Sequence, residues 1–431
     1  MEYDTTQLSS LLERAGRYAV PLLATSLLAA CGSSSDSSVH EDHHIESAGR
    51  LAMYDVDASA IKIFDLDDMA DFETFALTGE APRLYPSPDY RYATIIQRGD
   101  SQVSFLDSGL YTEDHDDHLH DVAESPMMLN FTLNGNRPTH YNVNGELSLI
   151  FNDASEGLVS SISIISEESL ENGEEVASLE LTNNMHGAAR LIDDQLFVTY
   201  RSAESVETTL PEAVERYSFT EGAFNFEERY ETLCPGLHGS ANNENFLVFG
   251  CTDGVLSINL QDESYPATKI ANPDSLLEDK RVGTVVAHEE RNELIGIAGD
   301  QFFLINPNSV TPMIELSLPL NAGKRILQGM DAHGERLYVL TDNGALHVYD
   351  AENNWELIKT LANVVSISED TVSALASISA AEETLFVFDR HAKKLVTIDL
   401  EEIEKLSERD IDFDVSSMVW LGLAEHEHEH E

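Results

Sequence analysis

The segment Leu-Tyr-Val-Leu-Thr-Asp-Asn-Gly-Ala-Leu-His-Val-Tyr-Asp, residues 337–350, contains the pattern that decides the fold. Two short apolar runs flank Asp342-Asn343-Gly344, and a turn of this kind between apolar, β-rich runs predicts a β-hairpin. The same pattern of strand, polar loop and strand recurs, so the chain is internally repetitive. The eight segments are Leu51–Leu66, Tyr92–Leu106, Leu147–Ile165, Leu196–Phe219, Phe246–Leu260, Leu294–Ile305, Leu337–Tyr349 and Leu385–Leu400.

The spacing of these segments predicts the architecture. Their starts are 41, 55, 49, 50, 48, 43 and 48 residues apart. A repeat of roughly 40 to 50 residues is typical of one four-stranded blade of a β-propeller. We therefore expect an all-β, single-domain propeller of seven or eight blades, with eight favoured by the number of hairpins. The clearest helical periodicity lies in Leu400–Arg409. Two sandwich domains are the alternative, but no low-complexity linker divides the chain.

The N-terminal residues predict export and a lipid anchor. The apolar stretch 19–30 is too short to cross a bilayer and is typical of a signal peptide. It ends in Leu-Ala-Ala-Cys, residues 28–31, which resembles a bacterial lipobox, so we expect Cys31 to be lipidated. Gly32 favours the outer membrane, which places the protein in the periplasm, with membrane contact through this anchor only. The expected parts are a signal peptide (1–30), a flexible Ser/His-rich tether (31–48), the propeller (49–420) and a His/Glu tail (421–431).

The net charge excludes some partners. With 25 basic and 78 acidic residues, the chain carries a formal charge of −53. Such a surface repels nucleic acid and anionic lipid. Adaptation to a salty environment explains this composition, so the charge is weak evidence for metal binding. The placement of the histidines is stronger evidence.

Three single histidines occupy equivalent places in successive repeats. His140, His186 and His238 each precede a turn that leads into the next apolar run. This slot belongs to the innermost strand of a blade, so the three side chains should meet at one mouth of the central channel. Neutral imidazoles with carboxylates nearby form zinc-type sites. Gly187 and Gly239, directly after two of the histidines, would let the backbones pack closely there.

A His/Asp-rich segment, residues 114–120, lies in the connection that enters the first of these three blades. We expect it to fold over the same mouth, where His115 would hold metal weakly. Weaker metal binding is also expected of the tether histidines, which are His40, His43 and His44. The C-terminal run of alternating His and Glu is either an affinity tag or a natural, weak metal binder.

Two cysteines remain beyond the lipobox. Cys234 and Cys251 are placed symmetrically about Asn242-Asn243, a predicted hairpin turn, so antiparallel pairing sets them opposite each other. In an oxidising compartment they should form a disulfide that fixes the segment bearing His238. Two thiolates joining a zinc site is the rival interpretation.

Taken together, the signal sequence, the propeller repeat, the 114–120 segment, the Met-His-Gly and Leu-His-Gly motifs and the cysteine pair resemble the AztD-type periplasmic zinc metallochaperones. The resemblance covers most of residues 40–400. It implies a β-propeller that holds Zn²⁺ and passes it to the solute-binding protein of a zinc ABC transporter. It also implies a tight site of channel-mouth histidines with a mobile His-rich segment nearby. Matching the motifs assigns this site to His140, His186 and His238, with His118 or His120 completing it. The lipobox departs from the family, in which a soluble carrier is expected.

Other functions remain open at this point. The chain has no Gly-x-Ser-x-Gly nucleophile motif, and we expect it not to be an enzyme. A metal-dependent propeller hydrolase or lactonase is the alternative, because an open zinc site can activate water. A non-catalytic surface scaffold is the third possibility. The residues do not distinguish zinc from copper or nickel.

Overall fold

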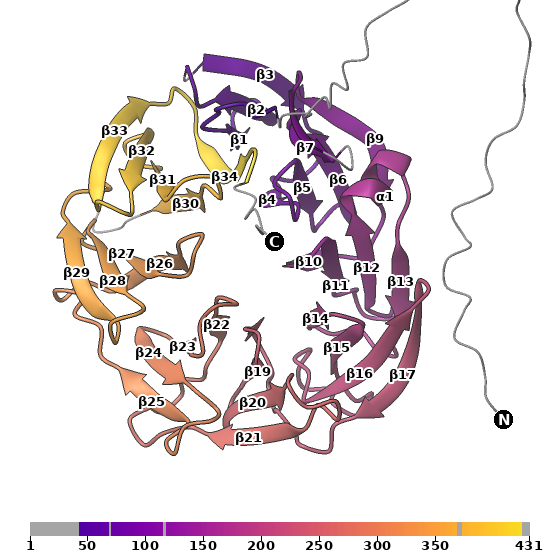
Figure 1. Cartoon of the computed structure of the whole chain (residues 1–431). Helices are drawn as coiled ribbons and strands as arrows, with labels where there is room; N and C mark the ends of the chain where they lie inside the picture. Colours follow the sequence, from indigo (N-terminus) through magenta and orange to yellow (C-terminus); the bar gives the residue numbers. More distant parts are fainter. Residues whose placement is uncertain (1–42, 69, 115–117, 369–372, 425–431) are drawn as a thin grey trace, which may run out of the picture. The chain divides into compact units, whose positions relative to one another are not determined.

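The computed structural model describes residues 43–424, apart from 69, 115–117 and 369–372. These residues belong to one compact unit, Asp42–Glu431. Within them, eight four-stranded antiparallel sheets are arranged in a ring (Figure 1). The prediction of an all-β propeller is confirmed, with eight blades. No helix in the described part of the chain is long and apolar enough to cross a membrane.

Each blade runs from an innermost to an outermost strand. The first blade combines both ends of the described chain. It consists of β34 (Val415–Leu421), β1 (Arg50–Asp55), β2 (Ala60–Asp65) and β3 (Ala70–Ala76). The next three blades are β4 (Arg83–Pro86), β5 (Tyr92–Gln97), β6 (Gln102–Asp107) and β9 (Met127–Leu133); β10 (Pro138–Asn144), β11 (Leu147–Asn152), β12 (Ser161–Ser166) and β13 (Ala177–Glu180); and β14 (Ala189–Ile192), β15 (Gln195–Tyr200), β16 (Ala213–Thr220) and β17 (Ala223–Arg229).

The remaining four blades repeat this order. They are β18 (Ser240–Asn242), β19 (Phe246–Cys251), β20 (Gly254–Asn259) and β21 (Ala267–Ala271); β22 (Thr284–Val286), β23 (Leu294–Ala298), β24 (Gln301–Ile305) and β25 (Met313–Leu316); β26 (Arg325–Met330), β27 (Arg336–Thr341), β28 (Leu346–Asp350) and β29 (Glu356–Leu361); and β30 (Ala374–Ile378), β31 (Thr384–Asp389), β32 (Lys394–Asp399) and β33 (Glu404–Asp410). The eight hairpins read from the sequence are the second and third strands of the eight blades.

The ring is closed by pairing of its first and last strands. In β34, Trp420 lies opposite Leu51 of β1, and both side chains are buried. The indole Nε1 of Trp420 donates a hydrogen bond to the carbonyl of Ala48. Burial of such large apolar surfaces on both strands stabilises the closure by several kcal/mol, at roughly 25 cal/mol per Å².

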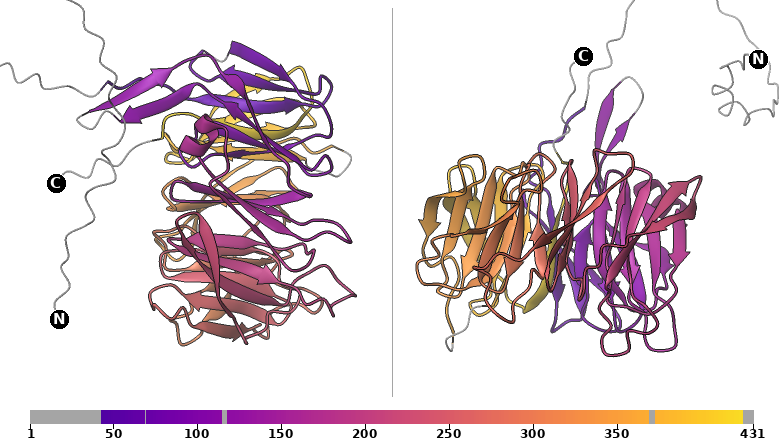
Figure 2. Two further views of the ribbon diagram at one scale, coloured as in Figure 1. Left: turned by 90° about the vertical axis from the view of Figure 1, so that its right-hand side faces the viewer. Right: turned by 90° about the horizontal axis from the view of Figure 1, so that it is seen from below.

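The alternation of the strands defines two faces of the ring. The innermost strand of each blade begins on the face where its second strand ends, as Pro138 opposite Asn152 shows. We call this face the His140 face. The connections from first to second strand and from third to fourth strand lie on the other face. An additional hairpin, β7 (Leu110–Asp114) with β8 (Leu119–Ala123), lies in one of these connections and projects from that face (Figure 2). We call it the hairpin face.

One local expectation is wrong. Leu400–Arg409 does not form a helix, because Glu404–Asp410 is the outer strand β33, where the exposed Leu406 fits an edge strand as well as a helix.

Among the residues that the structure describes, the one helix is α1 (Glu167–Asn172). It is capped by Ser166 and Ser169 and ends at Gly173 in the left-handed conformation.

The last part of the expected tether is not free. His43 donates its backbone N–H to the carbonyl of Leu119, and its carbonyl accepts from Asp121. Ser47 and Ala48 bond to the carboxylate of Asp67. Residues 43–48 therefore pack on the propeller, and the signal peptide, Cys31 and the C-terminal run 425–431 lie outside the described residues.

Candidate metal centre

Three imidazoles from three neighbouring blades meet on the His140 face. His140 lies in β10, His186 directly precedes β14, and His238 directly precedes β18. The ring centroids of His140 and His186 are 4.8 Å apart, those of His186 and His238 5.2 Å, and those of His140 and His238 6.2 Å. The structure thus brings together the three residues that the repeat alignment placed at one channel mouth.

The hydrogen bonds at Nδ1 of His186 and His238 leave the Nε2 lone pairs of the two rings facing each other. His238 Nδ1 lies 2.8 Å from the carbonyl oxygen of Gly283, which can only accept, so this nitrogen carries the ring hydrogen. His186 Nδ1 lies 2.9 Å from Oδ2 of Asp153 and donates to it in the same way. In the neutral rings both Nε2 atoms therefore lack hydrogen, yet they are only 3.3 Å apart. A cation bound between them removes the repulsion.

The spacing of the two nitrogens suits zinc. Zinc holds imidazole nitrogen at about 2.0–2.1 Å in tetrahedral geometry, which places two such ligands about 3.3 Å apart. The ligand atoms of His140, His186 and Asp153 also lie within 4.8 Å of one another. Three imidazole nitrogens with a fourth, open position are a donor set that zinc takes in proteins.

Asp153 is the carboxylate of the site. It is buried, and Oδ2 accepts from His186 Nδ1 and, at 2.7 Å, from the Arg98 guanidinium. Burial alone would raise the pKa of Asp153, but the hydrogen bonds from His186 and Arg98 outweigh it and lower the pKa. Its other oxygen, Oδ1, has no hydrogen-bond partner among the described residues. A buried ionised oxygen without a donor is costly. Oδ2 bonds to Nδ1, on the side of the His186 ring away from Nε2, so Asp153 orients His186 from outside the ligand shell of a metal held by Nε2.

Burial keeps two of the rings neutral. Desolvation, followed by repulsion from His186, lowers the pKa of His140 to about 4. Desolvation also lowers the pKa of His238, against the opposing hydrogen bond to Gly283. Zinc needs the unprotonated ring, so both ligands are ready at neutral pH without first losing a proton.

The two glycines after the histidines are required by close packing. A Cβ on Gly187 would collide with Thr199 Oγ1 and with the ring of Phe151. Gly239 has φ of +76°, and a Cβ there would lie 2.6 Å from the Gly283 carbonyl oxygen. Gly239 therefore allows the same close approach of strands that brings Gly283 within reach of His238.

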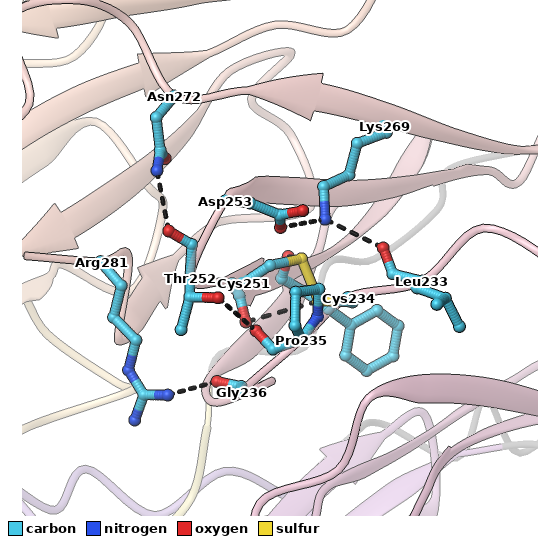
Figure 3. The surroundings of a disulfide bond; sticks show 12 residues. Leu233, Cys234, Pro235, Gly236, Cys251, Thr252, Asp253, Lys269, Asn272 and Arg281 are labelled. Atoms are coloured by element: carbon cyan, nitrogen blue, oxygen red, sulfur yellow. Dashed lines mark hydrogen bonds and ion pairs between the residues drawn. A yellow bond between two sulfur atoms is a disulfide. The ribbon is translucent and has the colours of Figure 1, made fainter.

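The cysteine pair fixes the segment before His238. Cys234 and Cys251 form a disulfide, as predicted, with their Cα atoms 5.0 Å apart. Neighbouring bonds hold the same segment (Figure 3). Thr252 donates to the Pro235 carbonyl, and Lys269 donates to the Leu233 carbonyl. The sulfurs are therefore not zinc ligands, and the bond anchors the chain leading to His238.

A cavity of about 530 Å³ gives access to the imidazoles. All three histidines contribute to its wall, together with the exposed Arg83 and the half-buried Arg98. The metal centre is therefore reached from the His140 face, beside two guanidinium groups in a strongly acidic protein.

The predicted fourth ligand is wrong. His118 and His120 belong to the β7–β8 hairpin, which joins the third strand of its blade to the fourth and so lies on the hairpin face. The His140 face is reached only by connections between blades and by connections from second to third strand. The expectation that residues 114–120 lie in the connection entering the blade of β10 is also wrong, because their described part lies within the preceding blade, between β6 and β9. His115 lies outside the described residues.

The hairpin histidines instead meet the end of the tether. The rings of His43 and His120 stack with centroids 4.7 Å apart, and His44 Nδ1 lies 3.5 Å from Oδ2 of the buried Asp121. Residues 40–44 also match the spacing His-Glu-x-x-His, which sequence reasoning overlooked. That motif requires a helix to place both imidazoles on one metal, whereas His43 pairs with β8 as a strand does. His40 lies outside the described residues.

Asp153 is the functional candidate that sequence reasoning missed. It follows the second strand of its blade, and acidic residues such as Asp253, Asp300 and Asp342 occupy similar turns in other blades. Aspartate is common in turns for local hydrogen bonding, so the residue type alone carries no signal. The signal lay in the topology, because the end of the second strand adjoins the start of the innermost strand that bears His140.

Comparisons with known proteins show what the whole chain is similar to. No family model matches the chain. The zinc chaperone AztD of Citrobacter koseri is 23% identical over 384 residues, covering 87% of each protein. The crystal structure of C. koseri AztD superposes with a TM-score of 0.73 at 21% identity, covering 88% of this chain and 100% of that one. Dihydro-heme d1 dehydrogenase NirN shares the fold less closely, with a TM-score of 0.58 at 12% identity, over 88% and 76% of the two chains. The similarity to AztD expected from the motifs is confirmed.

Proposed function

We propose that this protein is a periplasmic zinc carrier whose cargo is bound by His140, His186 and His238, with Asp153 orienting the ring of His186. The observation that carries the proposal is the pair of Nε2 atoms 3.3 Å apart, each with its Nδ1 hydrogen used elsewhere. The similarity to the zinc chaperone AztD over 87% of the chain supports the same role, and supports a carrier over a catalyst.

The geometry suits a carrier because the ligands differ in how firmly they are held. His238 is anchored by the Gly283 carbonyl and by the disulfide-bonded segment before it, and His186 is anchored by Asp153. Among the residues that the structure describes, the ring of His140 makes no such hydrogen bond, and it lines the open cavity. An acceptor ligand entering this cavity can replace His140 first, while His186 and His238 still hold the ion.

We infer that the acceptor is the solute-binding protein of a zinc ABC transporter and that Cys31 anchors the carrier by lipid. The exposed Arg83 beside the cavity favours an acceptor whose entry surface is acidic. The histidines on the hairpin face would form a separate, weaker zinc site that gathers metal on the side away from the handover. The His43–His120 stack and the buried Asp121 support that assignment.

The proposal is tested with protein lacking residues 1–42 and 425–431, which removes His40 and the terminal His/Glu run. Competition titration with a chelator should show one tight zinc ion per chain. Mixing the zinc form with apo acceptor should transfer this ion faster than it dissociates into chelator alone. Tight binding without transfer, together with hydrolysis of lactone or phosphoester substrates by the zinc form, would contradict the carrier and favour the enzyme. Copper is expected to displace zinc from an equimolar mixture at equilibrium by the Irving–Williams order alone. The identity of the cargo is therefore read from the metal that the acceptor receives.

A further inference from the structure

Two buried carboxylates face each other on the hairpin face, between the seventh and eighth blades. Asp331 follows the innermost strand β26 and is 3% exposed, and its side chain is completely buried. Glu383 precedes β31 in the next blade, and its side chain is 14% exposed. The two carboxyl groups lie close enough for a hydrogen bond if one of them carried a proton. The pair lies on the face opposite the candidate zinc centre.

Three oxygens of this pair have no donor. Asp331 Oδ1 and both oxygens of Glu383 lack a hydrogen-bond partner in the described part of the chain. Arg336 reaches only Asp331 Oδ2, at 3.4 Å, and shares its guanidinium with Glu335. His333 Nε2 lies 3.5 Å from Glu383 Oε1 without hydrogen-bond geometry. Buried carboxylates without donors are rare unless a cation or a proton neutralises them.

A local structural role does not explain Asp331. The equivalent residues of other blades are Ser87 and Ser379, whose N–H groups also bond to the carbonyl five residues later. Ser379 Oγ accepts from two N–H groups of its own turn, and Ser87 Oγ accepts from the Tyr92 N–H. The carboxylate of Asp331 accepts no N–H group of its turn in the contacts described, although a shorter hydroxyl would do so. Oδ2 accepts instead from Arg336, and Oδ1 has no hydrogen-bond partner among the described residues.

The surroundings provide space and charge for a cation. A cavity of about 490 Å³ opens beside Glu383. Its wall carries one guanidinium, one imidazole and five carboxylates, which are those of Glu335, Glu382, Glu383, Asp399 and Glu401. Calcium takes six to eight oxygen ligands from carboxylates and water in adaptable geometry. The cavity has room for the waters that would complete such a shell.

We propose that Asp331 and Glu383 hold a divalent cation of the calcium type between the seventh and eighth blades. The cation neutralises the buried carboxylates and links two blades close to the closure of the ring. This site is independent of the zinc cargo, because its donors are oxygens and it lies on the other face. Its binding should stabilise the folded protein, since the unfolded chain offers no such pair.

The test uses the His186→Ala/His238→Ala protein, so that the cargo site does not contribute. After treatment with EDTA, isothermal titration with calcium in moderate salt should show one saturable site per chain, and calcium should raise Tm. Asp331→Asn/Glu383→Gln should lose both effects. Glu335→Gln/Glu401→Gln removes two carboxylates from the same cavity wall and should keep both, which controls for nonspecific attraction to an acidic surface.

Several outcomes would overturn the proposal. The first is equal calcium binding by Asp331→Asn/Glu383→Gln and the parent protein. The second is saturation by magnesium or zinc but not by calcium. The third is a calcium-independent Tm that falls as pH rises, because a shared proton rather than a cation would then neutralise the pair. If Asp331→Asn prevents folding, Glu383→Gln alone gives the same comparison, because Glu383 supplies two of the three oxygens.

Discussion

His186 Nε2 and His238 Nε2 face each other across 3.3 Å, although the partners of their Nδ1 atoms leave neither nitrogen a hydrogen to share. Without a metal, one ring must be protonated or must turn away. With zinc, the same distance is the edge of a tetrahedron. The apo protein therefore holds its two best ligands in an arrangement that favours cation binding before the cation arrives.

Removing either ring should abolish tight binding. His186→Ala or His238→Ala deletes one of the three nitrogen ligands of the site. Zinc affinity should fall by more than the roughly 10–100-fold typical of losing an outer-shell partner. Competition titration of the protein without residues 1–42 and 425–431 measures this. His288→Ala is the control, because its ring bonds to the Ala332 carbonyl on the other face. Tight binding that survives both ligand variants would exclude this centre.

Asp153→Asn should weaken zinc binding by roughly 10–100-fold, because the residue orients His186 from outside the ligand shell. The amide keeps the shape but loses the charge that holds the Nδ1 hydrogen of His186. Asp342→Asn serves as the control, because that carboxylate bonds to the Lys324 N–H at a comparable turn. Chelator competition with both variants gives the two affinities. No difference between them would remove Asp153 from the site.

The hairpin histidines should not affect the tight site. His118→Ala/His120→Ala should change its affinity by less than about twofold, because distant sites without shared partners behave independently. The same variant should reduce the uptake of a second, weaker zinc equivalent. Isothermal titration over two equivalents separates the two effects. A large loss at the tight site would mean that the hairpin reaches the His140 face in solution.

Acid should destabilise the apo protein. The folded pKa of His140, about 4, lies below the value of 6.5 expected when the chain is unfolded. Between these values the unfolded chain binds a proton that the folded chain does not. The contribution of the neutral ring to the free energy of unfolding is therefore fully present above about pH 6.5, and it is lost as pH falls toward 4. The lowered pKa of His238 acts in the same direction. The Tm of His140→Ala should depend less on pH over this interval, whereas the exposed His333→Ala should behave like wild type.

Loss of the disulfide should cost stability. Cys234→Ser/Cys251→Ser opens a loop with a sequence separation of 17 residues. The chain-entropy model gives about 3 kcal/mol for a loop of this size. Urea unfolding measures the difference. Zinc affinity should also fall, because the segment before His238 is freed. The loss should be partial, because the Thr252–Pro235 contact still holds this segment. Unchanged unfolding free energy would show that strand pairing alone holds this hairpin.

The fold was largely predictable because every blade repeats one hairpin. Strand, turn and strand follow a period that a single sequence displays, as Leu337–Tyr349 shows. The closure by β34 was less evident, since nothing local in Val415–Leu421 indicates pairing with β1. The outer strand β33 was mistaken for a helix because an exposed edge strand, open to solvent, has no strict alternation.

The site was predictable only as far as the repeat extends. His140, His186 and His238 occupy equivalent slots, so the propeller symmetry alone brings them together. The hairpin β7–β8 is an insertion into one blade, and its side of the ring depends on which connection contains it. Only one strand, β9, separates residues 114–120 from the connection on the His140 face. The spacing of the sequence does not show on which side of this strand the segment lies. Asp153 lay hidden among turn aspartates.

The position of bound zinc tests the central claim most directly. Crystals of the protein without residues 1–42 and 425–431, loaded with one equivalent of zinc, should give anomalous diffraction at the zinc absorption edge. We predict one strong peak between His186 Nε2 and His238 Nε2, about 2.0–2.1 Å from each, with His140 as the third protein ligand. A peak beside His43 and His120 on the hairpin face, with none among the three channel-mouth imidazoles, would contradict the account.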